Sequence, residues 1–112
     1  MEKVRKELLQ GTLDLLILKA LATDQMHGWD ISKRIQLVSK DRLKLKQGSL
    51  YPALHRLEAR DWIVSEWGVS EAGRSAKFYS LTRKGKAQLL EEKEHWLSFA
   101  EAMTSVLKME EQ

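Results

Sequence analysis

The sequence predicts a mainly α-helical fold that contains one small β-hairpin. Three observations support this fold class. Leucines at helical spacing fill the first part of the chain, two aromatic and β-branched segments follow at residues 62–67 and 76–81, and a second apolar stripe runs through the last part. Two helices joined by a short polar turn and followed by a hairpin make a winged helix-turn-helix. We therefore expect that domain over residues 1–82 and a long C-terminal dimerisation helix over residues 83–112.

Length and composition limit the class of protein. A chain of 112 residues buries roughly two-thirds of its unfolded surface, which is enough for a core without disulfides or metal. It contains no cysteine, so a cysteine-type zinc site and disulfide chemistry are excluded. The N-terminal residues lack a signal-peptide core and no apolar run is long enough to span a membrane. We expect a soluble, cytoplasmic protein that uses no cofactor.

The first predicted helix covers residues 5–22. Its leucines lie around most of its circumference, which is typical of a helix that is buried on more than one side. We interpret it as the central core helix. Its early turns are expected to meet a partner chain, through Leu8 and Leu15.

The second predicted helix covers residues 29–39. Ile31, Ile35 and Val38 form its inward stripe. Residues 40–44 then make the turn into the helix on which the functional prediction depends.

That third helix lies within residues 44–60. Its leucines recur at i, i+4 and i+7, so they share one face and anchor the helix to the core; they are Leu50, Leu54 and Leu57. Pro52 is the only proline of the chain, and proline is tolerated in the first turn of a helix. The helix is therefore expected to begin close to Ser49, with Ser49 as a plausible N-cap.

The opposite face of this helix presents groups that suit base edges and phosphates. The candidate DNA-binding residues of this region are Lys44, Lys46, Gln47, Ser49, Tyr51, Pro52, His55 and Arg56. The lysines precede the helix, where its dipole disfavours cations, and a DNA phosphate would reverse that penalty. The alternative is an ordinary amphipathic helix with a solvated basic face, and for His55 a packing role is an equal alternative.

The two β-segments predict a hairpin with a long, flexible tip, since the eight residues between them are rich in glycine and serine. Arg74 and Lys77 stand on its tip and return strand, where they could reach a phosphate or a minor groove. The alternative is an edge strand that is protected by charge.

The distribution of charge supports a polyanionic partner. The net charge of the chain is +3, yet residues 31–60 carry +6 and residues 74–86 carry +5, while the other segments are neutral or acidic. This pattern predicts one basic face that binds double-stranded DNA and an acidic remainder that is turned away from it.

The last predicted helix is capped by Thr82 and runs to about Met109. Its apolar stripe has a 4-3-4 spacing and consists of Trp96, Ala100, Met103 and Leu107, with Phe99 on the adjoining row. A three-helix core with a hairpin has no surface left to cover such a helix. We therefore expect a homodimer in which the same helix of a second copy covers it.

These features together resemble the PadR transcriptional regulators, in particular the short subfamily with a single C-terminal helix. The resemblance covers about residues 8–98. The matching residues are Gly11-Thr12-Leu13 with Ile17-Leu18, His27-Gly28-Trp29 with Ile31, Gly48 to Leu54, Arg56-Leu57-Glu58, Trp62-Ile63, Gly73-Arg74, Lys77-Phe78-Tyr79, Leu81-Thr82, Gly85 and Trp96. Trp29 and Phe78 depart from the pattern, because tyrosine is more usual at both positions.

The resemblance implies a homodimeric winged-helix repressor that binds a palindromic operator and is often released by a small molecule. It also implies that the helix from about Gly48 and the hairpin around Arg74 contact DNA. In some short members a tryptophan that matches Trp96 stacks on flat aromatic compounds. For Trp96, Phe99 and Met103, a small aromatic effector and plain dimer packing are thus two open alternatives.

Two other classes of function, an enzyme and a protein-binding adaptor, are alternatives to a DNA-binding regulator. Glu92 and His95 form an E-x-x-H pair of the kind that di-iron bundles use, but such sites need two pairs and further glutamates, and only one pair exists here. The chain also lacks a glycine-rich phosphate loop and a cysteine nucleophile, so we do not expect an enzyme or a metal site. A dimeric winged-helix adaptor that binds proteins, without specific DNA binding, is the second alternative.

Overall fold

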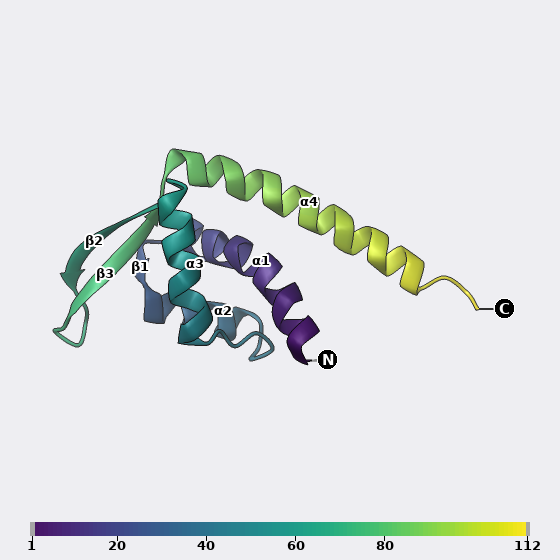
Figure 1. The fold of residues 1–112 in the computed structure, drawn as a ribbon, viewed down its shortest axis with the longest axis horizontal. Helices are drawn as coiled ribbons and strands as arrows, with labels where there is room; N and C mark the ends of the chain where they lie inside the picture. The colour runs from purple at the N-terminus through teal and green to yellow at the C-terminus, as the bar shows by residue number, and fades with distance from the viewer. Residues whose placement is uncertain (1, 112) are drawn as a thin grey trace.

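The computed structural model describes residues 2–111, with side chains described from residue 12 onward. The elements in chain order are α1 (Glu2–Thr23), β1 (Met26–His27), α2 (Gly28–Val38), α3 (Gln47–Ala59), β2 (Ile63–Val69), β3 (Ser75–Leu81) and α4 (Arg83–Leu107) (Figure 1). This order confirms a mainly α fold with a small hairpin, arranged as a winged helix-turn-helix and followed by a long helix. The predicted contact of Leu8 lies outside the described side chains.

The core lies where α1, α2 and α3 meet the base of the hairpin. One side chain from each element is completely buried there: Ile17 of α1, Ile31 of α2, Leu57 of α3 and Ile63 of β2. Burial of such a side chain contributes roughly 1.5–3 kcal/mol, so these contacts hold the domain together. Among the described side chains no charged one is buried, and Tyr79 is the one buried side chain that carries a polar group.

The sheet has three antiparallel strands in the order β1-β3-β2. Val69 pairs with Ser75, so the hairpin tip is residues 70–74, shorter than the eight residues expected from the sequence. Gly73 has a φ of 78°, which glycine adopts without strain, and its amide donates to the Ser70 carbonyl at 2.8 Å. The expected long flexible tip is thus a compact, hydrogen-bonded turn.

Two further expectations were wrong. The first concerns α2: Val38 is 74% exposed, because α2 ends at this residue and Ile35 is the last buried residue of the helix.

The second concerns α3: Ser49 is not an N-cap, because α3 begins at Gln47 with Lys46 before it. Pro52 consequently lies beyond the first turn of α3. Its missing amide removes the helical donor for the carbonyl of Gly48, and Gly48 is exposed, so that water can replace it.

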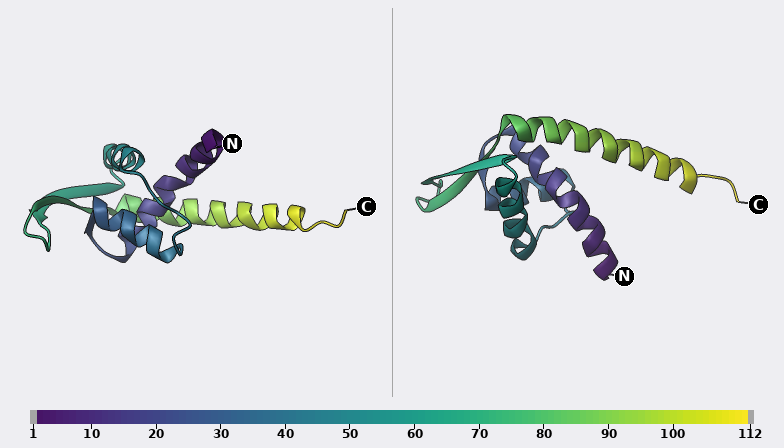
Figure 2. Two further views of the ribbon diagram at one scale, coloured as in Figure 1. Left: turned by 90° about the horizontal axis from the view of Figure 1, so that it is seen from below. Right: turned by 45° about the horizontal axis from the view of Figure 1, so that its top comes forward.

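Helix α4 is attached to the domain at its first turns. Thr82 caps it as predicted: the Thr82 hydroxyl accepts a hydrogen bond from the Gly85 amide at 2.9 Å and donates one to the Asp61 carbonyl at 2.6 Å. A side chain at Gly85 would collide with the Trp62 carbonyl, so glycine permits the close approach of helix and strand. From there α4 extends beyond the domain (Figure 2), and the molecule measures 61 × 28 × 22 Å.

None of the helices in the described part of the chain is both long enough and apolar enough to cross a membrane.

Candidate nucleic-acid interface

The exposed face of α3 carries the side chains that the sequence predicted for it. With Leu50, Leu54 and Leu57 buried, the helical period turns the neighbouring positions outward. The exposed residues of this region are Lys44, Lys46, Gln47, Ser49, Tyr51, Pro52 and His55. None of these seven side chains makes a described hydrogen bond or ion pair, and Tyr51 packs on the main chain of α2.

Tyr51 is held in place although it is 47% exposed. A Cβ atom added at Gly28 would lie 3.0 Å from the Tyr51 hydroxyl oxygen, so the ring lies directly on the first turn of α2. A rigid, half-exposed phenol with a free hydroxyl is a suitable contact for a base edge or a phosphate.

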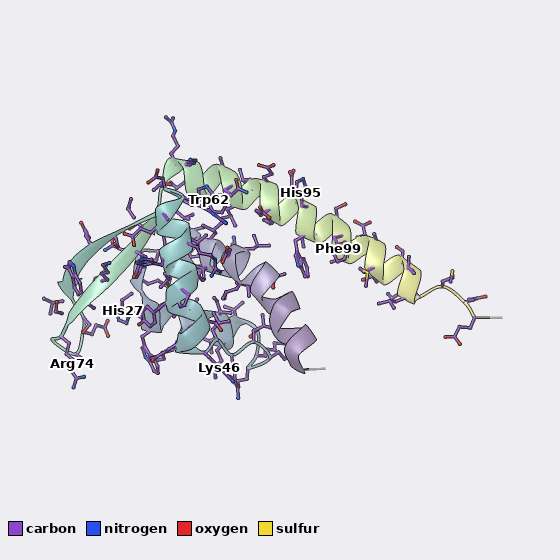
Figure 3. All side chains as sticks on the ribbon, viewed as in Figure 1. His27, Lys46, Trp62, Arg74, His95 and Phe99 are labelled. Carbon is purple, nitrogen blue, oxygen red and sulfur yellow. The ribbon has the colours of Figure 1, made fainter. Side chains whose placement is uncertain are left out.

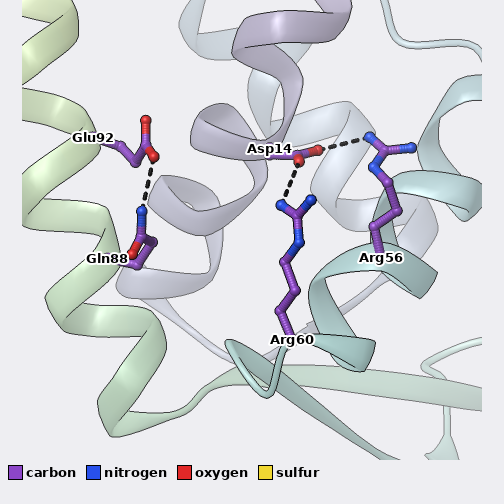
Figure 4. A network of polar contacts seen from close by, with 5 residues as sticks. All are labelled: Asp14, Arg56, Arg60, Gln88 and Glu92. Atoms are coloured by element: carbon purple, nitrogen blue, oxygen red, sulfur yellow. Dashed lines mark hydrogen bonds and ion pairs between the residues drawn. The ribbon is translucent and has the colours of Figure 1, made fainter.

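Arg56 has a partner that the sequence did not indicate. Its guanidinium donates to the Asp14 carboxylate of α1 at 2.9 Å, and Arg60 lies 3.9 Å from the other oxygen of the same carboxylate (Figure 4). The two residues of the closer pair are 42 positions apart in the chain. This ion pair joins the functional helix to α1, so Arg56 positions α3 as well as being available at its surface.

The hairpin places its cations beside α3. Arg74 is exposed at the tip, and in Figure 3 it lies on the same side of the molecule as Lys46 at the start of α3. The Lys77 ammonium lies 5.9 Å from the ring centroid of Trp67 on the neighbouring strand. The two residues are paired directly across the strands, and this distance allows a cation–π contact between them.

A hollow of about 1150 Å³ connects these elements. It is lined by Tyr51 of α3, Arg74 and Lys77 of the hairpin, and side chains of α2. The sequence had not indicated Trp29, Lys33 and Trp67, which also line it, although the alternation of Trp67 with Ile63 on one strand face could have placed it on this side. The carboxylates of Asp24, Asp30 and Glu71 line the hollow too.

Two side chains below this surface, Tyr79 and Glu58, stabilise the fold. Tyr79 is buried, and this burial raises the pKa of its hydroxyl above the ordinary 10.0, with the electrostatic effects of the nearby Glu58 and Tyr51 adding to the increase. It therefore stays neutral at physiological pH. Glu58 accepts a hydrogen bond from the Ser65 hydroxyl at 2.6 Å, which links α3 to β2.

The outer part of α4 is a second candidate surface. Beyond Leu89 its apolar side chains are not covered by any described part of the chain. Trp96 is 44% and Phe99 63% exposed, Met103 and Leu107 are also exposed, and Ala100 is half-buried. Figure 3 shows the stretch of α4 around His95 and Phe99 beyond the domain. Leu15 of α1 is half-buried and packs against the core.

The Glu92 and His95 pair forms no metal site in the described part of the chain, where no three metal-binding side chains are grouped. The Glu92 carboxylate instead accepts a hydrogen bond from the Gln88 amide at 2.8 Å (Figure 4).

Comparison with known proteins gives consistent results. Residues 17–91 match the model of the transcriptional regulator PadR-like family. The chain is 34% identical to transcriptional regulator Rv3488 of Mycobacterium tuberculosis over 88 residues. This alignment covers 79% of this chain and 78% of that protein.

Solved structures agree in fold. A transcriptional regulator from Clostridium thermocellum is similar with a TM-score of 0.82 and 26% identity, over 91% of this chain and 99% of that one. A PadR-like transcriptional regulator from Bacillus cereus has a TM-score of 0.80 and 27% identity, over 93% of this chain and 99% of that one.

The ion pair of Arg56 yields a prediction for stability. Arg56→Ala should lower the free energy of unfolding by about 1 kcal/mol, because it removes a partly shielded, charged hydrogen bond to Asp14. Arg60→Ala is the matched control and should cost less than about 0.5 kcal/mol, since its contact is longer and more exposed. Urea denaturation measures the free energy of unfolding of both variants. An equal loss for the two variants would contradict the structural role of Arg56.

Proposed function

We propose that this chain, which belongs to the PadR-like family of transcriptional regulators, acts as a homodimeric repressor that binds an inverted-repeat DNA operator. The observation that supports this most strongly is the hollow between α3 and the hairpin. There the exposed Tyr51 stands with the cations Arg74 and Lys77 on one surface.

The proposal divides the DNA contacts by type. Tyr51, Ser49, Gln47 and His55 enter the major groove with α3, where base edges are distinguishable. Lys44, Lys46, Arg74 and Lys77 contact phosphates or the minor groove and set affinity without sequence preference. The surface of Arg56 that Asp14 leaves exposed reaches the same DNA strand.

The apolar stripe of α4 provides the dimer in this proposal. Exposed Trp96, Phe99 and Met103 would be covered by the same residues of a second copy. A two-fold axis relates the two α3 helices, so they would enter successive major grooves about 34 Å apart. Repression then follows from occupation of promoter DNA.

The proposal is tested with DNA from immediately upstream of the chain's own coding region, over a salt series and with non-specific DNA as competitor. Lys46→Ala and Arg74→Ala should each reduce the slope of log K against log salt by about 1, because each removes a phosphate contact. Tyr51→Ala should leave the slope unchanged and lower the ratio of specific to non-specific affinity about tenfold.

Lys84→Ala is the matched control for charge. Lys84 is exposed in the first turn of α4, and in Figure 1 the beginning of α4 lies on the side of the molecule opposite the start of α3. Its removal should change neither quantity. Weak binding that is indifferent to sequence in the unmodified protein would refute the regulator proposal and favour a winged-helix adaptor.

The proposal includes release by a flat aromatic effector that stacks on Trp96 across the dimer and favours a spacing of the α3 helices that no longer fits DNA. Flat aromatic compounds should quench tryptophan fluorescence and weaken operator binding. Trp96→Ala should abolish both effects. Trp67→Ala, which removes a still more exposed tryptophan on the hairpin, should retain the quenching at Trp96. Equal binding of the compounds by Trp96→Ala would refute the stacking role.

A further inference from the structure

An apolar groove of about 310 Å³ lies between α1, α2 and the loop after α2, away from the hollow beside the hairpin. Its walls are the aliphatic side chains of Leu16, Ala20, Ile35, Val38 and Leu43. Val38, which the sequence placed in the core, is instead an exposed wall of this groove. Ala20 and Ile35 are buried at its floor, Leu16 and Leu43 are half-buried, and Val38 is exposed, so the described part of the chain leaves the groove open and a covering segment would add hydrophobic stabilisation.

The charges around the groove have one sign. Lys19 and Arg34 line it, together with Thr23 and Ser39, and no carboxylate is among its described lining residues. The Arg34 guanidinium donates only one described hydrogen bond, to the Thr23 hydroxyl at 3.2 Å, and neither cation forms a described ion pair. The matching occupant is therefore an apolar segment followed by negative charge.

The C-terminal end of the described chain is an apolar segment that ends in negative charge. Val106, Leu107 and Met109 are exposed, Lys108 stands among them, and Glu110 and Glu111 follow, so the segment has one positive and two negative charges and a negative end. Neither Glu110 nor Glu111 forms an ion pair in the described structure. Helix α4 carries this segment away from its own domain (Figures 1 and 2), so the groove that it could fill belongs to another copy.

The geometry of the proposed dimer brings the two surfaces together. Trp96 lies near the middle of α4, so two α4 helices that cross antiparallel at Trp96 place the end of one beside the first turns of the other, about 17 Å from the crossing. Helix α4 contacts α1, and Leu89 in its early turns is buried in the core that contains α1 side chains. On α1, Lys19 lies four residues after Leu15, so the groove adjoins the row for which a partner contact was predicted.

We propose that the C-terminal segment of a second copy, Val106 to Glu111, docks in the groove between α1 and α2, with its apolar side chains on Val38 and Leu43 and its glutamates beside Lys19 and Arg34. This inference rests on the proposed homodimer. It makes each winged domain part of the dimer interface, so that the segment links the partner's α4 to the helix pair that carries α3.

The absence of natural cysteines allows a direct test by cross-linking. The double variant Val38→Cys with Met109→Cys is treated with a short bismaleimide at low protein concentration, and covalent dimer is measured on a denaturing gel. The matched control is Leu37→Cys with Met109→Cys. Leu37 is 75% exposed like Val38 but lines a different pocket, on the other side of α2. All three positions are exposed, so both variants should fold, as circular dichroism would check.

Covalent dimer should form at least about tenfold faster in the Val38 variant than in the Leu37 control. Sedimentation equilibrium of the same samples reports whether they are dimers. Equal cross-linking rates in samples that sediment as dimers would overturn the docking of the C-terminal segment and leave the dimer intact. Samples that sediment as monomers would overturn both the docking and the homodimer of the proposed function.

Discussion

The burial of one face of α3 is the constraint on which the functional surface depends. Leu50, Leu54 and Leu57 are fully buried in the core that α3 shares with α1 and β2. Because a helix repeats every 3.6 residues, these contacts leave Tyr51 and His55 facing outward. The ion pair between Arg56 and Asp14 and the hydrogen bond between Ser65 and Glu58 then hold the same helix against rotation on its two sides. Hydrophobic contacts set the face of α3, and polar contacts to α1 and β2 keep it there.

Much of this arrangement follows from local patterns in the sequence. The leucine spacing predicts α3 and its buried face, and Thr82 predicts the start of α4, because a cap needs only residues within one turn. The hairpin follows from its aromatic and β-branched strands. Each of these signals is local, and each is confirmed.

The features that the sequence did not reveal depend on contacts between distant segments. Strand β1 has two residues, Met26 and His27, too few to show an alternating pattern, and exists because β3 pairs with it. Val38 matches an inward stripe, yet the core ends before it. The partner of Arg56 comes from a helix 42 residues earlier, and no local pattern can indicate it. Pro52 indicates a start close to Ser49, and α3 begins two residues earlier, at Gln47, because the hydrogen bond that Pro52 cannot donate would go to Gly48, an exposed residue where water can replace it.

The exposed stripe of α4 connects assembly to DNA recognition in the proposed regulator. A helix of 25 residues spans about 37 Å, so a small change in the angle at which two copies cross would produce a larger change at the winged domains. Docking of the C-terminal segment between α1 and α2 would reduce that freedom by tying each domain to the partner's helix. The spacing between the two α3 helices would then be a property of the dimer, and a ligand at Trp96 could alter it.

The most direct test of a two-fold dimer that reads successive major grooves is binding to synthetic operators that differ only in half-site spacing. Fluorescence anisotropy would compare an inverted repeat with half-site centres about 10 base pairs apart and one in which five base pairs are inserted between the half-sites. The insertion turns one half-site to the opposite side of the duplex. We expect the insertion to lower the affinity at least about a hundredfold, close to the non-specific level. Equal affinity for the two operators would contradict a two-fold dimer that reads successive major grooves.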